Sequence, residues 1–258
     1  MHLEALDVER DGPVLTVALD RPAKKNAANA AMWVELAETF RSAASDAEVR
    51  VVVVTGRGGE FCSGADLSDL GRGDEHALSS MRRVHEAALS LHRLPQPTIA
   101  KVDGVAVGAG CNLALGCDLV VASERARFSQ IFARRGLSPD FGGSWILPRV
   151  IGLHRAKELA FFAEILSAAE AFEAGLVNRV VPGDELDAFV AAWAGRLAAG
   201  PPLALAMAKS MLNDSASMSF AEALSREAEA QALNITSADG REALSAFVER
   251  REPRFEGR

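Results

Sequence analysis

The segment from Pro97 to Asp118, PTIAKVDGVAVGAGCNLALGCD, constrains the fold more than any other part of the chain. Residues 98–102 are β-branched or apolar apart from one lysine, which predicts a buried strand. Gly108-Ala109-Gly110 then leads into the apolar run CNLALGC, which predicts a helix. Such a junction leaves the first helical N–H groups unpaired, and small residues let a ligand approach the backbone. The segment therefore predicts either a tight packing turn or a backbone site that holds negative charge.

The glycine spacing of this segment separates it from the common phosphate-binding loops. From Gly104 it reads G-x-x-x-G-x-G, which lacks the third glycine of the dinucleotide-binding fingerprint, and no Gly-Lys-Ser/Thr ending of a P-loop follows. A backbone oxyanion site is the chemistry that this turn favours.

Composition narrows the classes of partner. The 258 residues are 49% hydrophobic and 24% charged, a balance that suits one α/β domain with an appendage or two small domains. The net charge of −7 argues against nucleic acid and anionic membranes as partners, although a few local cations can still hold an anionic ligand. No apolar run approaches the roughly 20 residues of a membrane span. Three cysteines without a C-x-x-C predict reduced thiols, a cytoplasmic location and no metal site.

The remaining elements are expected in the following order. Strands are predicted at 14–19, 49–55, 118–122, 126–129 and 177–181. Helices are predicted for about 15 residues after a cap at Asn29, from Asp74 to His92, over 152–174 and throughout the alanine-rich part after Gly183. A short helix is expected at Ala65-Asp66, and 130–150 is expected to be rich in loops. Pro201-Pro202 predicts a boundary between a body, residues 1–200, and a helical tail, residues 201–258, whose apolar faces pack on the body or on a neighbouring subunit.

Five segments, in this order along the chain, resemble the crotonase superfamily, the enoyl-CoA hydratase/isomerase group. They are LDRPAKKNAANAAM (19–32), VVVTGRGGEFCSGADL (52–67), PTIAKVDGVAVGAGCNLALGCDLVVASERARF (97–128), GLSPDFGGSWILPRVIG (136–152) and FVERREPRFEGR (247–258). The resemblance implies an α/β, crotonase-like spiral of ββα units with two roughly perpendicular sheets. It also implies a helical C-terminal trimerisation region, and hence a homotrimer or a dimer of trimers.

The resemblance also implies a substrate site. The backbone N–H groups of Ala65 and Ala109 would form the oxyanion hole for a coenzyme A thioester, which is a substrate, with no cofactor bound permanently. The nucleotide end of coenzyme A would meet two loops and the oxyanion turn, through Lys24, Lys25, Ala27, Ser63, Gly64, Ala65, Asp66, Leu67 and Gly108. Two alternatives stay open: the lysines form a solvated basic loop, and Asp66 is a structural acid at a helix start.

The sequence departs from the hydratases of this family at their two catalytic glutamates. The matching positions hold Asn112, which can orient a water but not accept a proton at neutral pH, and Phe132. Asp140, in SPDFGG, is the single carboxylate of residues 130–150, and superfamily isomerases carry an acid there. This motif, Trp145 included, looks most like that of ring-1,2-epoxyphenylacetyl-CoA isomerase. Phe132 and Trp145 would then line the acyl site, while a loop cap at Asp140 and a core position for Trp145 are the alternatives.

Three functions follow from these residues. The first is an isomerase that moves a double bond with Asp140 as its base. The second is another acyl-CoA enzyme, either a hydratase with unusual acids or a dehalogenase or hydrolase that uses Asp140 as a nucleophile. The third is a non-catalytic acyl-CoA-binding protein that kept the fold.

Overall fold

The computed structural model describes residues 3–68 and 76–258. Its larger sheet has the order β1-β2-β3-β4-β6-β9, in which every neighbouring pair is parallel except β1 and β2. These strands are Leu6–Asp11, Val14–Leu19, Val51–Gly56, Thr98–Val102, Leu119–Ser123 and Arg179–Val181. A second sheet joins β5 (Val105–Val107), β7 (Arg127–Ser129) and β8 (Ile165–Ser167).

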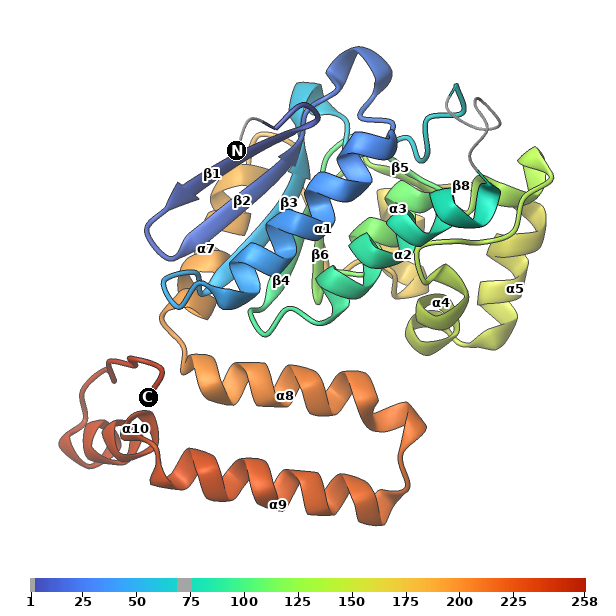
Figure 1. The fold of residues 1–258 in the computed structure, drawn as a ribbon. Helices are drawn as coiled ribbons and strands as arrows, with labels where there is room; N and C mark the ends of the chain where they lie inside the picture. The colour runs from blue at the N-terminus through green and yellow to red at the C-terminus, as the bar shows by residue number, and fades with distance from the viewer. Residues whose placement is uncertain (1–2, 69–75) are drawn as a thin grey trace.

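Helices cover both faces of the larger sheet (Figure 1). On one face lie α1 (Ala30–Ser45) and α2 (Ala77–His92), and on the other lies α7 (Leu186–Ala198). The apolar run of β3 is buried on both sides, with Val52 and Val54 in one core cluster and Val51 and Val53 in the other. This is the environment that an unbroken apolar strand predicts.

The chain passes between the two sheets immediately before the helix of the central segment. β4 belongs to the larger sheet and β5 to the smaller one, and the turn between them contains Gly104 at φ +61°. The helix that follows, α3 (Ala109–Leu115), is buried along its whole length. β6 and β7 repeat this division between the sheets. The predicted α/β architecture of ββα units with two sheets is therefore confirmed.

Four predictions about local structure need correction or lie outside the described residues. Ala65-Asp66 begins no helix, because Ala65 forms a parallel bridge with Ala28. The segment 130–150 is more helical than expected, with a 3₁₀ turn at Ile131–Arg135 and α4 at Gly143–Ile151. The helical prediction for 152–174 holds for α5 (Leu153–Phe162) and α6 (Ala168–Ala174), which β8 separates. The expected helix start at Asp74 lies outside the described residues, and α2 is described from Ala77.

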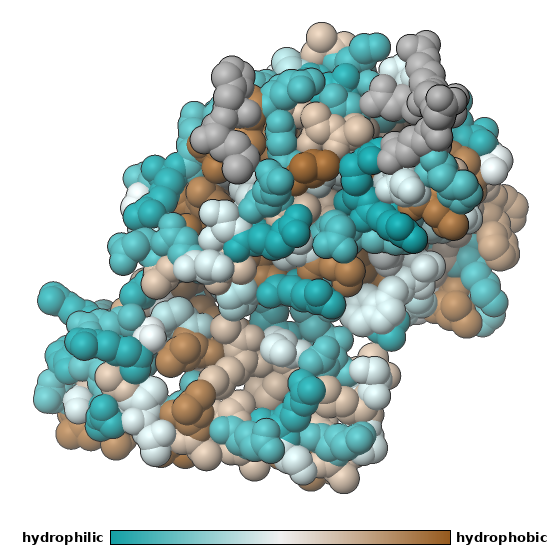
Figure 2. All heavy atoms as spheres, viewed as in Figure 1, coloured by the Kyte–Doolittle hydropathy of each residue, from teal (hydrophilic) through white to brown (hydrophobic). Residues whose placement is uncertain are grey.

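Three helices after Pro201 extend from the body: α8 (Pro202–Asp214), α9 (Phe220–Thr236) and α10 (Ala238–Glu249). All residues of α8 and α9 are at least partly exposed, and Figure 2 shows apolar atoms across the surface of this part. Lys209 ties α8 to the body through an ion pair of 2.7 Å between its Nζ and Asp118 Oδ2. Of the described helices, none is by itself long and apolar enough to cross a membrane, although the bent pair Leu186–Ala198 and Pro202–Ser217 would pass on length and composition together.

Candidate active site

Backbone hydrogen bonds join the loop at residues 24–28 to the loop at residues 62–66. Ser63 N donates to Lys25 O at 3.0 Å, Ala28 N donates to Gly64 O at 2.8 Å, and Asp66 N donates to Ala28 O at 2.8 Å. The parallel bridge between Ala28 and Ala65 thus uses Gly64 O and Asp66 N, and it leaves the Ala65 N–H facing away from Ala28. Within residues 3–68 and 76–258, this amide donates no hydrogen bond.

The start of α3 lies directly beside this loop. A Cβ placed on Gly64, which has φ +100°, would lie 2.9 Å from Val107 O and 3.9 Å from Ala109 N. Ala109 is the first residue of α3, so its N–H has no acceptor within the helix. The structure therefore brings the two predicted oxyanion amides to one place, where only glycine permits so close an approach.

Asp140 occupies a tight turn that leads into α4. Its carbonyl accepts a hydrogen bond from Gly143 N at 2.9 Å, while Phe141 and Gly142 adopt left-handed conformations at φ +46° and +80°. The Asp140 Oδ1 atom is buried and has no hydrogen-bond partner among the described residues. Burial raises the pKa of this carboxyl to about 6. A carboxylate with a pKa near neutrality suits a general base.

The Asp140 carboxylate lies close enough to the Ala65 loop to act on Cys62 electrostatically. Burial is the main cause that raises the pKa of the Cys62 thiol to about 12, and the charge of Asp140 adds to it. Cys62 stands three residues before Ala65 and donates from Sγ to Asn26 O at 3.1 Å. The charge of Asp140 is therefore felt at the loop that carries Ala65.

Asn112 is fully buried, and protein groups occupy both ends of its amide. Its Nδ2 donates to Asp140 O at 2.9 Å, and its Oδ1 accepts from Gln130 Nε2 at 2.8 Å. Sequence analysis did not identify Gln130 as a site residue. The available signal was a polar residue that directly follows a buried strand.

Phe132 packs over the turn that precedes α3. A Cβ on Gly108 would lie 3.7 Å from Phe132 Cζ, and the ring is 6% exposed. By the resemblance, an apolar ring thus stands at the position of the second hydratase glutamate.

The predicted coenzyme A residues lie along the two joined loops. Lys24 is exposed, and the Lys25 side chain, 62% exposed, pairs with Glu60 at 3.2 Å. Ser63 Oγ donates to Lys24 O at 3.2 Å, and Leu67 is 51% exposed. Ala27 is half-buried and receives a hydrogen bond on its carbonyl from the Arg21 side chain.

Asp66 and Asn26 hold these loops in place. A hydrogen bond from Ser68, and then the Arg21 guanidinium 3.0 Å away, lower the pKa of the Asp66 carboxyl to about 2. Asp66 is therefore a loop anchor, and the helix expected to begin there does not exist. Sequence analysis missed Asn26, which is fully buried and donates from Nδ2 to Arg57 O at 2.9 Å.

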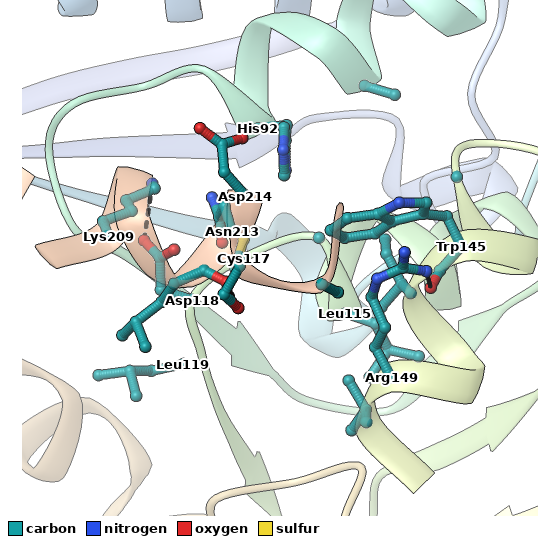
Figure 3. Close-up of a pocket in the computed structure, with 18 of the residues that line it drawn as sticks. His92, Leu115, Cys117, Asp118, Leu119, Trp145, Arg149, Lys209, Asn213 and Asp214 are labelled. Atoms are coloured by element: carbon teal, nitrogen blue, oxygen red, sulfur yellow. Dashed lines mark hydrogen bonds and ion pairs between the residues drawn. The ribbon is translucent and has the colours of Figure 1, made fainter. Parts of the chain in front are cut away.

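Trp145 faces a cavity of 1030 Å³ between α2, α4 and α8 (Figure 3). Its ring lies edge-on to His92, with centroids 5.4 Å apart, and the Arg149 guanidinium lies 3.9 Å above it. Phe141 also lines this cavity, whereas Ala65, Ala109 and Asp140 do not belong to its described lining. The structure thus places Trp145 on the wall of this cavity, which Phe141 and Gly142 of the Asp140 turn also line. In the described part of the chain, no cluster of three His, Cys, Asp or Glu side chains could hold a metal ion.

The two sheets built from ββα units and the helices after Pro201 define a crotonase-fold protein, in which the loop of Ala65 lies beside the start of α3. Residues 9–258 match the family model for enoyl-CoA hydratase/isomerase, so the chain belongs to that family of acyl-CoA enzymes. This confirms the family that the motifs predicted.

Similar proteins carry both hydratase and isomerase names. A probable enoyl-CoA hydratase of Rhodobacter capsulatus is 42% identical over the full length of both chains. The 1,2-epoxyphenylacetyl-CoA isomerase of Escherichia coli is 38% identical over 95% of each chain, and the 2,3-dehydroadipyl-CoA hydratase of the same species is 37% identical over 99% of this chain and 100% of the other. The crystal structure of an enoyl-CoA hydratase from Bacillus anthracis superposes with a TM-score of 0.95 at 32% identity, over 99% of this chain and 100% of that one.

Proposed function

We propose that the protein is an enoyl-CoA isomerase that moves a double bond with a single base, Asp140. The observation that carries the proposal is the orphaned, buried Oδ1 atom of Asp140, on a carboxyl whose pKa burial raises to about 6. Such a group is ionised at neutral pH, yet it binds a proton far more readily than an exposed aspartate does.

The mechanism needs one base and one oxyanion site. The Asp140 carboxylate removes a proton from C2 of a 3-enoyl ester, the carbon next to the thioester carbonyl, and the electron pair moves towards the carbonyl oxygen. The Ala65 and Ala109 N–H groups stabilise the resulting enolate, each by about 3–4 kcal/mol. Asp140 then returns the proton to a different carbon, so the double bond shifts and the base is regenerated.

Hydration is the second candidate, because several of the similar enzymes bear hydratase names. Hydration needs groups that position and deprotonate a water. Both ends of the Asn112 amide are hydrogen-bonded to protein groups, and the Phe132 ring has no polar atom that could bind or deprotonate a water. These contacts favour isomerisation over hydration.

The proposal includes a coenzyme A thioester as the substrate and no permanently bound cofactor or metal. Lys24 and the exposed end of Lys25 supply local positive charge for the phosphates of coenzyme A, beside Ala27, Ser63 and Leu67. A cytoplasmic location remains a prediction from the reduced cysteines.

The proposal also includes a homotrimer or a dimer of trimers. Phe220 and Phe247, on α9 and α10, are 80% and 82% exposed, and Leu244 and Val248 lie beside Phe247 with 67% and 72% of their surface exposed. Apolar surface of this kind on an extended tail suits burial against a second copy of the chain.

The deciding experiment measures isomerisation of 3-enoyl-CoA esters and hydration of crotonyl-CoA by the same enzyme, together with exchange of acyl protons in heavy water. We expect isomerisation and exchange in the wild type, with hydration much slower. Hydration of crotonyl-CoA far faster than any isomerisation would refute the proposal, and an absence of both turnover and exchange would favour a binding protein. A covalent acyl–Asp140 adduct seen by mass spectrometry would instead identify a nucleophile.

A further inference from the structure

We infer that Asn112 and Gln130 are positioning residues, which hold the Asp140 turn at a fixed place relative to the oxyanion amides. The inference rests on the proposed role of Asp140 as the base. It assigns to Asn112 a task different from orienting water, and it adds Gln130 to the site.

A chain of hydrogen bonds carries the inference. Gln130 Nε2 donates to Asn112 Oδ1 at 2.8 Å, and Asn112 Nδ2 donates to Asp140 O at 2.9 Å. Gln130 is 2% exposed and Asn112 is fully buried, so water does not compete for these bonds. Because Gln130 donates to Oδ1, the Asn112 amide is oriented with Nδ2 towards Asp140. Gln130 therefore acts on Asp140 through Asn112.

We call the pair Asn112 and Gln130 the clamp. The helix α3 carries both Asn112 of the clamp and the proposed oxyanion amide of Ala109. Ala109 and Asn112 are three residues apart in α3, which corresponds to an axial rise of about 4.5 Å. The helix thus sets the distance between the N–H that receives the enolate oxygen and the side chain that holds the base. A shift of the Asp140 turn relative to α3 would change the distance between the base and the Ala109 N–H.

A close approach at the start of α4 completes the clamp. A Cβ on Gly143 would lie 2.3 Å from Asn112 Nδ2, so only glycine lets α4 reach this position. The Gly143 N–H donates to the same Asp140 carbonyl that Asn112 holds. On the other side of the turn, the Phe141 ring packs on Trp33 with centroids 5.5 Å apart. Two donors and one ring contact therefore fix the backbone of Asp140, while its Oδ1 stays unpaired.

The test combines Asn112→Leu, which keeps the size of the side chain and removes its donor, with Asp140→Asn in a double-mutant cycle. We expect Asn112→Leu to lower kcat for isomerisation at least tenfold with KM nearly unchanged, because the base is misplaced while the coenzyme A contacts remain. In the Asp140→Asn background, the same change should cause no further loss. Losses that multiply would show that Asn112 acts independently of Asp140 and would overturn the inference.

A direct titration of Asp140 by NMR of its carboxyl carbon separates this inference from the proposed function. Loosening the turn should admit water and lower the Asp140 pKa from about 6 towards its ordinary value in Asn112→Leu and in Gln130→Met. The Cys62 thiol, the titratable group that responds to Asp140, stays protonated over this pH range. If Asp140→Asn keeps full activity, the proposed function is wrong. The Asp140 titrations in Asn112→Leu and Gln130→Met still test whether the clamp holds the turn. An unchanged Asp140 pKa in both variants would overturn the clamp.

Two glycine variants check the geometry without altering the hydrogen-bonding side chains. Gly143→Ala should displace Asn112 and reproduce the loss in kcat. Gly195→Ala, on α7 with no atom within 4 Å of the added Cβ, should leave kcat unchanged. Wild-type activity and an unchanged Asp140 pKa in a folded Gly143→Ala enzyme would contradict the inference.

Discussion

Replacing Asp140 by asparagine should reduce activity and increase stability in the same protein. The carboxyl is buried, one of its oxygens has no partner among the described residues, and its pKa is about 6 instead of 3.8. Folding therefore disfavours the ionised form of this group. Asparagine keeps the shape and removes the charge, so the folded state no longer has to hold a buried carboxylate.

The magnitude follows from the size of the pKa change. A rise of about 2 units, at 1.36 kcal/mol for each unit, corresponds to about 3 kcal/mol at pH 7 and above. Because the pKa is raised on folding, the stability of the wild type is highest below the unfolded value and falls as the pH rises through about 6. The advantage of Asp140→Asn should accordingly be small at pH 4, about 1.5 kcal/mol at pH 5 and up to about 3 kcal/mol at pH 8.

Urea denaturation at pH 5 and pH 8, at one protein concentration, measures the stability difference, and isomerase turnover measures the catalytic cost. We expect turnover to fall by about 10²–10⁴ with affinity for the coenzyme A ester nearly unchanged. Asp184→Asn, at an exposed position on the body, serves as the control and should change neither quantity. A variant that is less stable than the wild type at pH 8, or equally stabilised at both pH values, would refute the buried-carboxylate reasoning. Isomerisation at the wild-type rate by Asp140→Asn would refute the assignment of Asp140 as the base.

Three other perturbations test the site, the tail and the assembly. Gly64→Ala places a Cβ 2.9 Å from Val107 O at φ +100°, so it should displace the loop of Ala65 and lower kcat by about 10²–10³. Wild-type values in steady-state kinetics would contradict the proposal that the Ala65 and Ala109 amides form the oxyanion hole. Lys209→Met removes the ion pair with Asp118 and the hydrogen bond of 3.0 Å to Gln96 O, although Asp118 keeps its hydrogen bonds from Thr98. The change should weaken the attachment of α8 by about 2–3 kcal/mol and speed proteolysis near Pro201, whereas unchanged cleavage would show that these contacts do not hold the tail. Phe247→Asp should lower the mass seen by light scattering to that of a monomer, and the matched change Phe161→Asp on α5 should leave a trimer; a wild type that is itself monomeric would exclude the predicted assembly.

Several features of the fold and the site could be predicted from local sequence alone. The β-branched run of β3 requires burial on both faces, and Asn29 caps α1 by accepting a hydrogen bond from Met32 N at 2.9 Å. The small residues before α3 predicted a tight turn between a strand and a helix, which the structure has between β5 and α3. These are local properties of the chain, so a single sequence contains them.

Short elements and loop contacts escaped prediction because they depend on distant partners. Of the smaller sheet, only β7 was predicted, whereas β5 and β8 have three residues each and become strands by pairing with β7. Ala65-Asp66 has a composition compatible with a helix start, but pairing with Ala28 makes it extended. The motif could not show what surrounds Trp145, because its cavity is formed by α2, α4 and α8, which are far apart in the sequence.

The sequence by itself determined the family, the order of the main elements and the chemical inventory, which has Asp140 but not the two hydratase glutamates. These follow from residue identity, spacing and periodicity. Tertiary structure alone decided that Asp140 has a buried oxygen without a partner among the described residues, that Gln130 orients Asn112 towards the Asp140 carbonyl, and that the loop of Ala65 lies beside the start of α3. The physical reason is that burial, pKa and hydrogen-bond partnership belong to a residue's surroundings, which segments distant in sequence supply when the chain folds.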